Sequence, residues 1–442
     1  MISVNTPVVV QKNQTDNLAR FESLEDWLSW QEALHFTAID LGLDRVRTVA
    51  ERMGLLEPSF AVLSVAGTNG KGSSVTMLES ILRRSGYRTG KYTSPHLIKY
   101  NERICVDGES VNDDLICSAF ARIDNARKEI SLTYFEFGTL AALDIFQRSK
   151  VDIAVLEVGL GGRLDAVNIL DADAALVTSI DIDHENWLGS DRESIALEKA
   201  GIFRNNSPAV CSDPCPPDCI AEYANSIGTD LQLLGHDYHY STNTDSWSWR
   251  SKSLVYNELV RPSLHDDCQM QNAAGVLKLF DMISEKFTVT EEAIKSGLQE
   301  FRLEGRFQII PSVVPYILDV AHNAQSARML ANNLRKLATG GTTHCIVGML
   351  KDKNHETIFK ELSSIVDIWY IVDLDSERAE KAEKLMEKIV ASVNVAKVRN
   401  YNSVKNTLDY LAGHAKAGER IVITGSFLTV RDALLYLHSD LR

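Results

Sequence analysis

The chain has 442 residues, 45% of them hydrophobic and 24% charged, and its formal net charge is −14. This length exceeds one ordinary hydrophobic core, so two or three domains are expected. The negative charge argues against broad electrostatic attraction to nucleic acid or to an anionic membrane. No apolar run approaches the ~18 residues that span a bilayer, and residues 1–16 lack the features of a secretory signal.

The cysteines stand at positions 105, 117, 211, 215, 219, 268 and 345. An odd number of cysteines in a chain of this length favours reduced thiols and a cytoplasmic location. Cys211, Cys215 and Cys219 recur every four residues, but the prolines among them interrupt any helix and the spacing differs from that of a zinc site. We expect a loop there, with metal binding as the minor alternative.

The first predicted elements are a buried strand over 60–65 and a helix over 73–84. A glycine-rich turn joins them, formed by Gly67, Thr68, Asn69, Gly70, Lys71, Gly72 and Ser73. Backbone N–H groups, the start of a helix and a lysine together suit phosphate groups. The spacing departs from the usual P-loop pattern because Gly72 separates Lys71 from Ser73. The alternative is a plain turn with an exposed lysine, but the full context favours ATP or a relative of it.

Alternating strands and helices continue along the chain. Helices are predicted over 111–128 and 139–147, and strands over 151–158 and 174–180. This alternation indicates a mostly parallel sheet covered by helices on both faces. Residues 205–268 are less regular and indicate either a small β-rich portion or an elaborated edge of the first sheet. A helix is predicted over 269–284.

A second alternation follows from about residue 306. The predicted strands are 316–320, 344–347, 367–372, 395–398 and 420–424, with helices at 324–337 and 428–437 and between the remaining strands. We therefore predict an α/β protein with a P-loop-type ATPase domain over 1–304, which has a mostly parallel sheet, and a Rossmann-like domain over 305–442.

Acidic and imidazole side chains follow several predicted strands. Glu157 ends one strand, and Asp183 and His184 follow the next. Ligands of parallel sheets bind at this edge, and carboxylate oxygens suit Mg²⁺. The alternative is a structural role for each residue. In the second alternation, Asp319, His322 and Asn323 stand after a strand, where they either grip a substrate or cap the following helix.

Together these motifs resemble the folylpolyglutamate synthase/dihydrofolate synthase family of the Mur ligase superfamily. The resemblance extends from about residue 22 to the C-terminus and is weakest over 205–268. The extra glycine of the phosphate loop is a feature of this family. The matching segments are 67–73, 93–97, 101–104, 135–136, 157–165, 183–184, 198–202, 305–306, 319–323 and 425–427.

The resemblance implies an ATP-dependent ligase that joins L-glutamate to dihydropteroate and to reduced folates through an acyl phosphate. Lys71 and the loop amides would hold the phosphates of ATP, and Asn272, Arg306 and Asp319 would also contact ATP. Ser94 and Glu157 resemble ligands of a first Mg²⁺, and His184 a ligand of a second. Lys199 is expected to be carbamylated and to face the metal, because an ammonium group would repel it. A monovalent cation remains open as a further cofactor.

The resemblance also implies substrate contacts, and with them domain closure over a cleft. Asp319, His322 and Ser426 resemble residues on the glutamate side. The segment over 39–46 looks like that of bifunctional bacterial enzymes, so both activities are expected, in a cytoplasmic monomer with only small-molecule partners. The pterin-side residues are Leu41, Gly42, Leu43, Asp44, Thr133, Tyr134, Phe135, Glu136 and Leu164.

Three alternatives remain open. The enzyme could have only one of the two activities. It could be another Mur-type ligase, although only about 60 residues precede the phosphate loop, too few for an additional substrate domain of typical size. It could also be a nucleotide-dependent switch that hydrolyses ATP slowly, although the second α/β domain and the motif from Asp319 to Asn323 argue against this.

Overall fold

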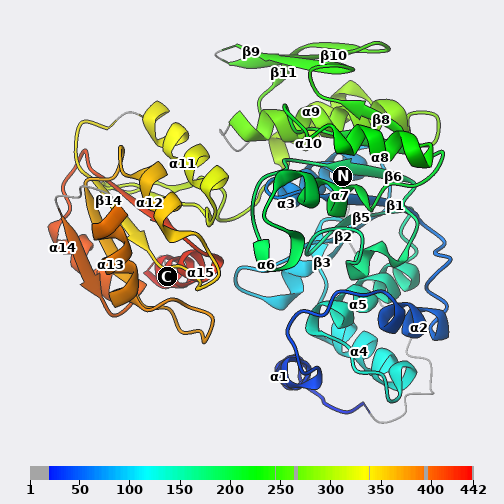
Figure 1. Cartoon of the computed structure of the whole chain (residues 1–442), viewed down its shortest axis with the longest axis horizontal. Coiled ribbons are helices and arrows are strands. Elements are labelled where there is room, and N and C mark those ends of the chain that lie inside the picture. Colours follow the sequence, from blue (N-terminus) through cyan, green and yellow to red (C-terminus); the bar gives the residue numbers. More distant parts are fainter. Residues whose placement is uncertain (1–18, 244, 263–266, 338, 393–396, 441–442) are drawn as a thin grey trace, which may run out of the picture.

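The computed structural model describes residues 19–243, 245–262, 267–337, 339–392 and 397–440. Within these residues it contains an eight-stranded sheet, a three-stranded sheet and a six-stranded sheet. The eight-stranded sheet belongs to the N-terminal domain and the six-stranded sheet to the C-terminal domain, and the two domains lie side by side (Figure 1). The predicted fold class is confirmed.

The eight-stranded sheet has the order β4-β3-β2-β5-β1-β6-β7-β8. Strand β1 lies near its middle and pairs in parallel with β5 and β6, while β3 runs antiparallel to β2 at one side. The strands are β1 (Ala61–Ala66), β2 (Thr89–Tyr92), β3 (Ile104–Val106), β4 (Glu109–Ser110), β5 (Ile153–Glu157), β6 (Ala174–Val177), β7 (Pro208–Cys211) and β8 (Asp230–Leu233).

Each face of this sheet carries its own hydrophobic core, because successive residues of a strand point to opposite faces. Leu63 and Val65 of β1 pack with α3, α9 and α10, whereas Val62 and Ala66 pack with the helices of the other face. The first set is α3 (Lys71–Arg84), α9 (Asp267–Met282) and α10 (Glu291–Glu300). The second set is α1 (Leu24–Leu34), α2 (Asp44–Arg52), α4 (Asp113–Arg127), α5 (Tyr134–Ser149), α7 (Arg192–Ala200) and α8 (Cys219–Ile227).

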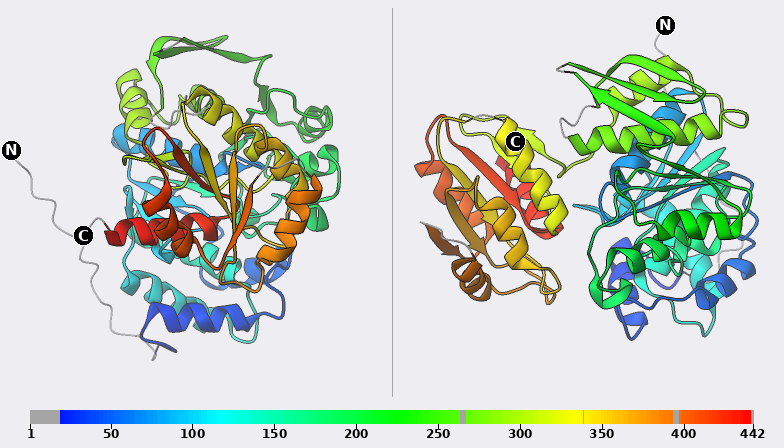
Figure 2. Two further views of the ribbon diagram at one scale, coloured as in Figure 1. Left: turned by 90° about the vertical axis from the view of Figure 1, so that its left-hand side faces the viewer. Right: turned by 45° about the horizontal axis from the view of Figure 1, so that its top comes forward.

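Both expectations for residues 205–268 are partly right. Strands β7 and β8 extend the edge of the first sheet, and β9 (Tyr238–Thr242), β10 (Ser246–Ser251) and β11 (Val255–Val260) form the separate three-stranded sheet. This small sheet covers α9 and α10 on the side away from the first sheet (Figures 1 and 2). The buried Trp249 secures it, because its indole N–H donates to the carbonyl of Ala274 in α9 at 3.1 Å.

The expected loop at the cysteine cluster is correct only for Cys215. Cys211 ends β7 and Cys219 begins α8, so the three thiols lie on a strand, a loop and a helix. Over the described ranges, no group of three or more His, Cys, Asp or Glu side chains could hold a metal ion.

The C-terminal sheet has the order β12-β13-β17-β14-β15-β16 and is parallel except for β12. Its strands are β12 (Gln308–Ile310), β13 (Tyr316–Leu318), β14 (Thr343–Val347), β15 (Ile368–Val372), β16 (Val398–Tyr401) and β17 (Arg420–Thr424). Its helices are α11 (Ala324–Lys336), α12 (His355–Leu362), α13 (Ala382–Ser392), α14 (Val404–His414) and α15 (Phe427–Asp440). The strand predicted over 395–398 begins only at Val398, and residues 395 and 396 lie outside the described part.

Helix α5 begins five residues before the predicted start at 139, at Tyr134. The reason is a capping box: the Thr133 side chain accepts from the Glu136 N–H, and the Glu136 carboxylate accepts from the Thr133 N–H. The remaining short elements are α6 (Glu185–Leu188) and the 3₁₀ turns η1 (Tyr100–Arg103) and η2 (Ala166–Ile169). Among the described helices, none is long and apolar enough to cross a membrane.

Candidate functional site

A cavity lies in the cleft where the carboxyl ends of β1, β5 and β6 face the C-terminal domain. All the residues that the sequence predicts to act in catalysis, nucleotide binding or metal binding line it. Of the predicted substrate residues, only His322 does so. The predicted residues at the cavity are Gly67, Thr68, Asn69, Gly70, Lys71, Gly72, Ser73, Ser94, Glu157, His184, Lys199, Asn272, Arg306, Asp319 and His322.

The phosphate loop is held open by glycines and by the end of β6. Gly70 has a φ of +91° and caps α3, a left-handed conformation that other residues rarely adopt. A Cβ on Gly70 would lie 2.4 Å from Oδ1 of Asn272 in α9. The side chain of Thr178 fixes the other side of the loop by donating to the carbonyl of Asn69 at 2.7 Å. The glycines and the end of β6 therefore constrain the shape of this loop, which lines the cavity.

This geometry predicts a specific effect of Gly70→Ala. The substitution should weaken ADP binding about tenfold, equivalent to roughly one lost hydrogen bond, because the new methyl group displaces Asn272. Gly235→Ala is the matched control, since Gly235 also has a positive φ, +84°, but a Cβ there meets nothing within 4 Å. Both variants should lose about 1–2 kcal/mol of stability from the strained backbone. Isothermal titration calorimetry with ADP checks the difference, and equal affinity in the two variants would contradict it.

Two half-buried cations line the cavity. The Lys71 ammonium donates to the carbonyls of Gly67 and Thr68 at 3.0 and 3.2 Å, and burial lowers the pKa of Lys71 although Glu157 opposes the shift. The buried Nη1 of Arg306 has no hydrogen-bond partner, and the guanidinium lies 5.1 Å from the centre of the Phe427 ring. A buried, unsatisfied guanidinium nitrogen costs free energy that an anion would recover. Both cations therefore suit phosphate oxygens.

Three candidate metal ligands sit in states that suit a cation. The buried Glu157 carboxylate accepts from the Ser94 N–H at 3.1 Å, and although burial raises its pKa, Lys71 opposes that shift. Burial lowers the pKa of His184 to about 4, so its imidazole is neutral at pH 7 and can ligate. Burial, then the charge of Lys71, lowers the pKa of Lys199 to about 7. With the Ser94 hydroxyl, this donor set of carboxylate, imidazole and hydroxyl fits a divalent cation.

Several neighbouring residues have structural roles that the sequence left open. The Asp165 carboxylate shapes the turn after β5 by accepting from the N–H groups of Leu160 and Val167. The Asp319 carboxylate accepts from the N–H groups of Phe307 and Ala321 while facing the cavity. The capping alternative is right for Asn323, whose side chain accepts from the Ser326 N–H at the start of α11.

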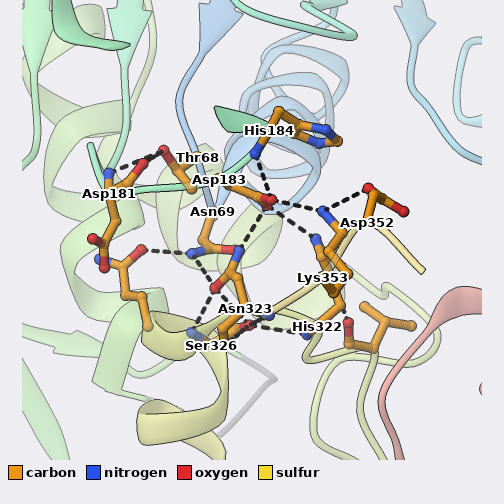
Figure 3. A network of polar contacts seen from close by, with 12 residues as sticks. Thr68, Asn69, Asp181, Asp183, His184, His322, Asn323, Ser326, Asp352 and Lys353 are labelled. Carbon is orange, nitrogen blue, oxygen red and sulfur yellow. Dashed lines mark hydrogen bonds and ion pairs between the residues drawn. The ribbon is translucent and has the colours of Figure 1, made fainter. Parts of the chain in front are cut away.

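A polar network joins the two domains across the cleft (Figure 3). The Asn69 amide donates to Oδ1 of Asn323 and to Oε1 of Gln325, and Asp183 meets Asn323 and Lys353 from the C-terminal domain. Sequence reasoning did not single out Gln325 and Lys353. Their positions after β13 and β14 could have indicated them, because parallel strands present their carboxyl ends to one edge of the sheet.

The predicted pterin-side segments lie next to each other but outside the cavity. Leu43 and Asp44 begin α2, and Thr133–Glu136 begins α5. The Arg45 guanidinium links the two segments by donating to Oε1 of Glu136 at 3.1 Å. The Phe135 ring packs against Gly159, because a Cβ on Gly159 would lie only 2.6 Å from that ring. Gly159 in turn lines the cavity.

Leu164 and Ser426 also lie outside the cavity lining. Leu164 is half-buried in the turn that precedes η2. The buried Ser426 hydroxyl shares a hydrogen bond of 2.7 Å with the Thr429 hydroxyl in the first turn of α15.

Family models match both domains: the Mur ligase middle domain over residues 65–226 and the Mur ligase glutamate ligase domain over residues 305–427. The chain is 42% identical over 407 residues to the dihydrofolate synthase/folylpolyglutamate synthase of Escherichia coli (strain K12), covering 92% of this chain and 94% of that protein. The chain belongs to the dihydrofolate synthase/folylpolyglutamate synthase family. Members of this family are ATP-dependent amide-forming ligases.

Solved structures of dihydrofolate synthase/folylpolyglutamate synthases share the fold. E. coli FolC in complex with DHPP and ADP superposes with a TM-score of 0.91 at 41% identity, covering 97% of this chain and all of that one. A bifunctional folylpolyglutamate synthase/dihydrofolate synthase with Mn, AMPPNP and L-glutamate bound gives a TM-score of 0.87 at 40% identity, with coverage of 94% and 98%. Nucleotide, metal and glutamate are thus bound by relatives of this fold.

Proposed function

We propose that the protein is a bifunctional ATP-dependent ligase that adds L-glutamate to dihydropteroate, forming dihydrofolate, and to reduced folyl(poly)glutamates. The observation that carries the proposal is the cleft cavity, where the phosphate loop, Glu157 and His184 face Arg306 and His322 of the C-terminal domain. The relatives with DHPP, ADP, AMPPNP, Mn and L-glutamate bound support these substrates.

In the first half-reaction, a carboxylate oxygen of the pteroate or folate attacks the γ-phosphorus of ATP. The bond between the γ-phosphorus and the oxygen that bridges to the β-phosphate breaks. The products are ADP and an acyl phosphate. Carboxylate and triphosphate repel each other, so cations must bring them together. Lys71, the loop amides over 67–73 and Arg306 supply positive charge at the phosphates. Mg²⁺, which Ser94, Glu157, His184 and a carbamylated Lys199 would hold at two sites, would neutralise further phosphate charge.

In the second half-reaction, the amine of glutamate attacks the acyl carbonyl, and the tetrahedral species collapses with loss of phosphate and a proton. His322 and Ser426 would orient glutamate from the C-terminal domain, and Asn272 and Asp319 would hold ATP with Arg306. Exclusion of water by the closed cleft protects the acyl phosphate from hydrolysis. In this proposal the domain over 1–304 would bind ATP and the pterin, and the domain over 305–442 would bind glutamate and contribute Arg306 and Asp319 to the ATP site.

The proposed pterin side comprises residues 41–44, residues 133–136 and Leu164. The hydrogen bond between Arg45 and Glu136 supports this assignment, because it joins the start of α2 to the start of α5. The start of α5 also carries Phe135, whose ring packs against Gly159 of the cavity lining. Two substrates of different length must present their carboxylate to the same γ-phosphate. The pterin therefore has to bind at two positions, and residues 41–44 would line the pocket for the shorter substrate.

We expect the purified protein to turn over both dihydropteroate and a reduced folate monoglutamate. Each is assayed separately with ATP, Mg²⁺ and L-glutamate, and ADP release is measured with and without each acceptor. Release that depends on both glutamate and the pteroate compound confirms the ligase. Turnover of only one acceptor would refute bifunctionality, and ADP release without an acceptor would instead indicate a nucleotide switch.

We also propose that the enzyme works as a monomer in the cytoplasm with small-molecule partners alone. The seven cysteines and the net charge of −14 support this setting. A monovalent cation remains a candidate cofactor, to be tested by comparing activity in potassium and tetramethylammonium salts. Size-exclusion chromatography with light scattering tests the monomer.

A further inference from the structure

A buried ion pair crosses the cleft between the loops that follow β6 and β14. The Lys353 ammonium lies 2.6 Å from Oδ1 of Asp183, and the two side chains are only 6% and 9% exposed. Separating such a pair without rehydrating it is costly, so the contact is well defined when the domains are together. A separation of the domains would return both groups to water and break the pair.

The Asp183 carboxylate also holds its own neighbour. Its Oδ1 accepts from the backbone N–H of His184 at 2.8 Å. His184 has a φ of 54° and a ψ of 40°, a left-handed conformation that disfavours residues with a Cβ. The hydrogen bond from the His184 N–H tethers the backbone of this turn to the Asp183 carboxylate. The direction of the His184 side chain therefore depends on where the Asp183 carboxylate sits.

The other side chains on this carboxylate come from the C-terminal domain. Asn323 donates to Oδ2 at 3.0 Å and the His322 ring lies 3.5 Å from it, in addition to Lys353 on Oδ1 (Figure 3). Burial would raise the pKa of Asp183, but His322 above all, with His184 and Lys353, holds it well below its ordinary value. The carboxylate is charged, and the C-terminal domain provides the groups that fix it.

Lys353 itself is not among the residues that line the cavity. Its other acidic neighbour is Asp352 of its own loop, at 3.8 Å. A role through Asp183 therefore fits its position better than contact with the reacting groups.

We propose that Lys353 is a positioning residue that couples domain closure to the placement of His184, through its ion pair with Asp183. This proposal rests on the proposed function in one respect, namely that His184 is a metal ligand in that function. Closure brings the ammonium to Asp183, the carboxylate then locks the His184 turn, and the imidazole is presented to the cavity. With the domains apart, His184 loses this constraint.

The test compares Lys353→Met, Lys353→Arg, Asp183→Asn and the double variant Lys353→Met/Asp183→Asn. Lys351→Met is the matched control, because Lys351 lies two residues away, is exposed and donates to the Glu377 carbonyl within its own domain. Mn²⁺ binding in the presence of ADP is measured by electron paramagnetic resonance, closure by small-angle X-ray scattering, and turnover by ADP release.

Lys353→Met is expected to weaken Mn²⁺ binding about tenfold, to reduce closure and to lower kcat about tenfold while leaving KM for glutamate within about twofold. Asp183→Asn should lower Mn²⁺ binding and kcat by about the same factors as Lys353→Met. The double variant should lose no more than either single variant. Lys353→Arg should retain most of the wild-type Mn²⁺ binding and kcat. Lys351→Met should match the wild type. Scattering and Mn²⁺ binding need no turnover, so they test the coupling even if the ligase assignment fails.

The opposite results would overturn the proposal. A raised KM for glutamate with unchanged Mn²⁺ binding and scattering would make Lys353 a direct substrate contact. Fully additive losses in the double variant would show that the two side chains do not act as a pair.

Discussion

Replacing Lys71 by alanine is expected to slow ligation about a hundredfold or more while leaving the fold intact. The Lys71 ammonium is half-buried at the start of α3 and donates to the carbonyls of Gly67 and Thr68. Once a triphosphate enters the loop, this ammonium is the nearest full positive charge that the loop itself supplies. Its loss leaves the developing phosphate charge poorly compensated. Steady-state ADP release with both acceptors measures the effect.

A second readout separates this effect from damage to the fold. ADP raises the melting temperature of a protein that binds ADP in the folded state and not in the unfolded state. Without ADP, Lys71→Ala should melt at the same temperature as the wild type. With ADP, its melting temperature should rise much less than that of the wild type. Lys99→Ala is the control, because Lys99 is exposed and does not line the cavity. Near-normal turnover by purified Lys71→Ala would show that the loop does not work as a phosphate site.

Lys199 is expected to carry a carbamate on its ε-nitrogen. Lys199→Ala should lower the turnover about a hundredfold, which is the usual effect of removing one group that stabilises charge in a transition state. CO₂ reacts with a neutral amine. Burial, then Lys71, lowers the pKa of Lys199 from 10.5 to about 7, so a large part of the amine is neutral near pH 7. The product is an anionic oxygen ligand near the charge of Lys71. Acetate or formate added to Lys199→Ala should restore part of the activity.

The sign of the pH dependence follows from the lowered pKa. Below about pH 7 the ammonium form of Lys199 predominates and cannot react with CO₂, so activity and carbamate should both fall as the pH is lowered. Carbon-13 NMR with labelled bicarbonate should give a signal that is absent in Lys199→Ala and retained in Lys278→Ala, since the buried Lys278 is paired with Asp281 at 2.8 Å. A plain lysine directed away from the metal, in crystals grown near neutral pH with Mg²⁺ and nucleotide, would refute the carbamate.

The local chemistry of the site was predictable from the sequence. A buried strand, a glycine-rich turn and a helix follow one another here, and Gly67 and Gly70 occur where φ is positive, so the shape of this turn was predictable. Glu157 and His184 were predictable for a similar reason, since parallel strands bring their carboxyl ends to one edge. The resemblance to the family added Lys199 and Arg306, which ordinary spacing rules would have left as surface charges.

Element boundaries were less predictable where a polar cap extends a helix beyond its apolar pattern. Thr133 and Glu136 carry the spacing of a capping box, yet the apolar repeat alone placed the start of α5 at 139. The same two residues therefore have a definite structural role beside their predicted contact with a substrate. Asn323 combines a helix cap with a contact across the cleft in the same way.

The sequence by itself determined β1, β5 and β6, the parallel strands of the C-terminal sheet, the phosphate loop and the acids at the strand ends. Each of these depends on neighbours within a few residues. Only the tertiary structure decided which distant groups meet. Asp183 and Lys353 are 170 positions apart, and Arg45 and Glu136 are 91 apart. The lowered pKa of Lys199 and the unsatisfied Nη1 of Arg306 also arise there. Both depend on removing charges from water, and burial is a property of the packed domains rather than of any local run of residues.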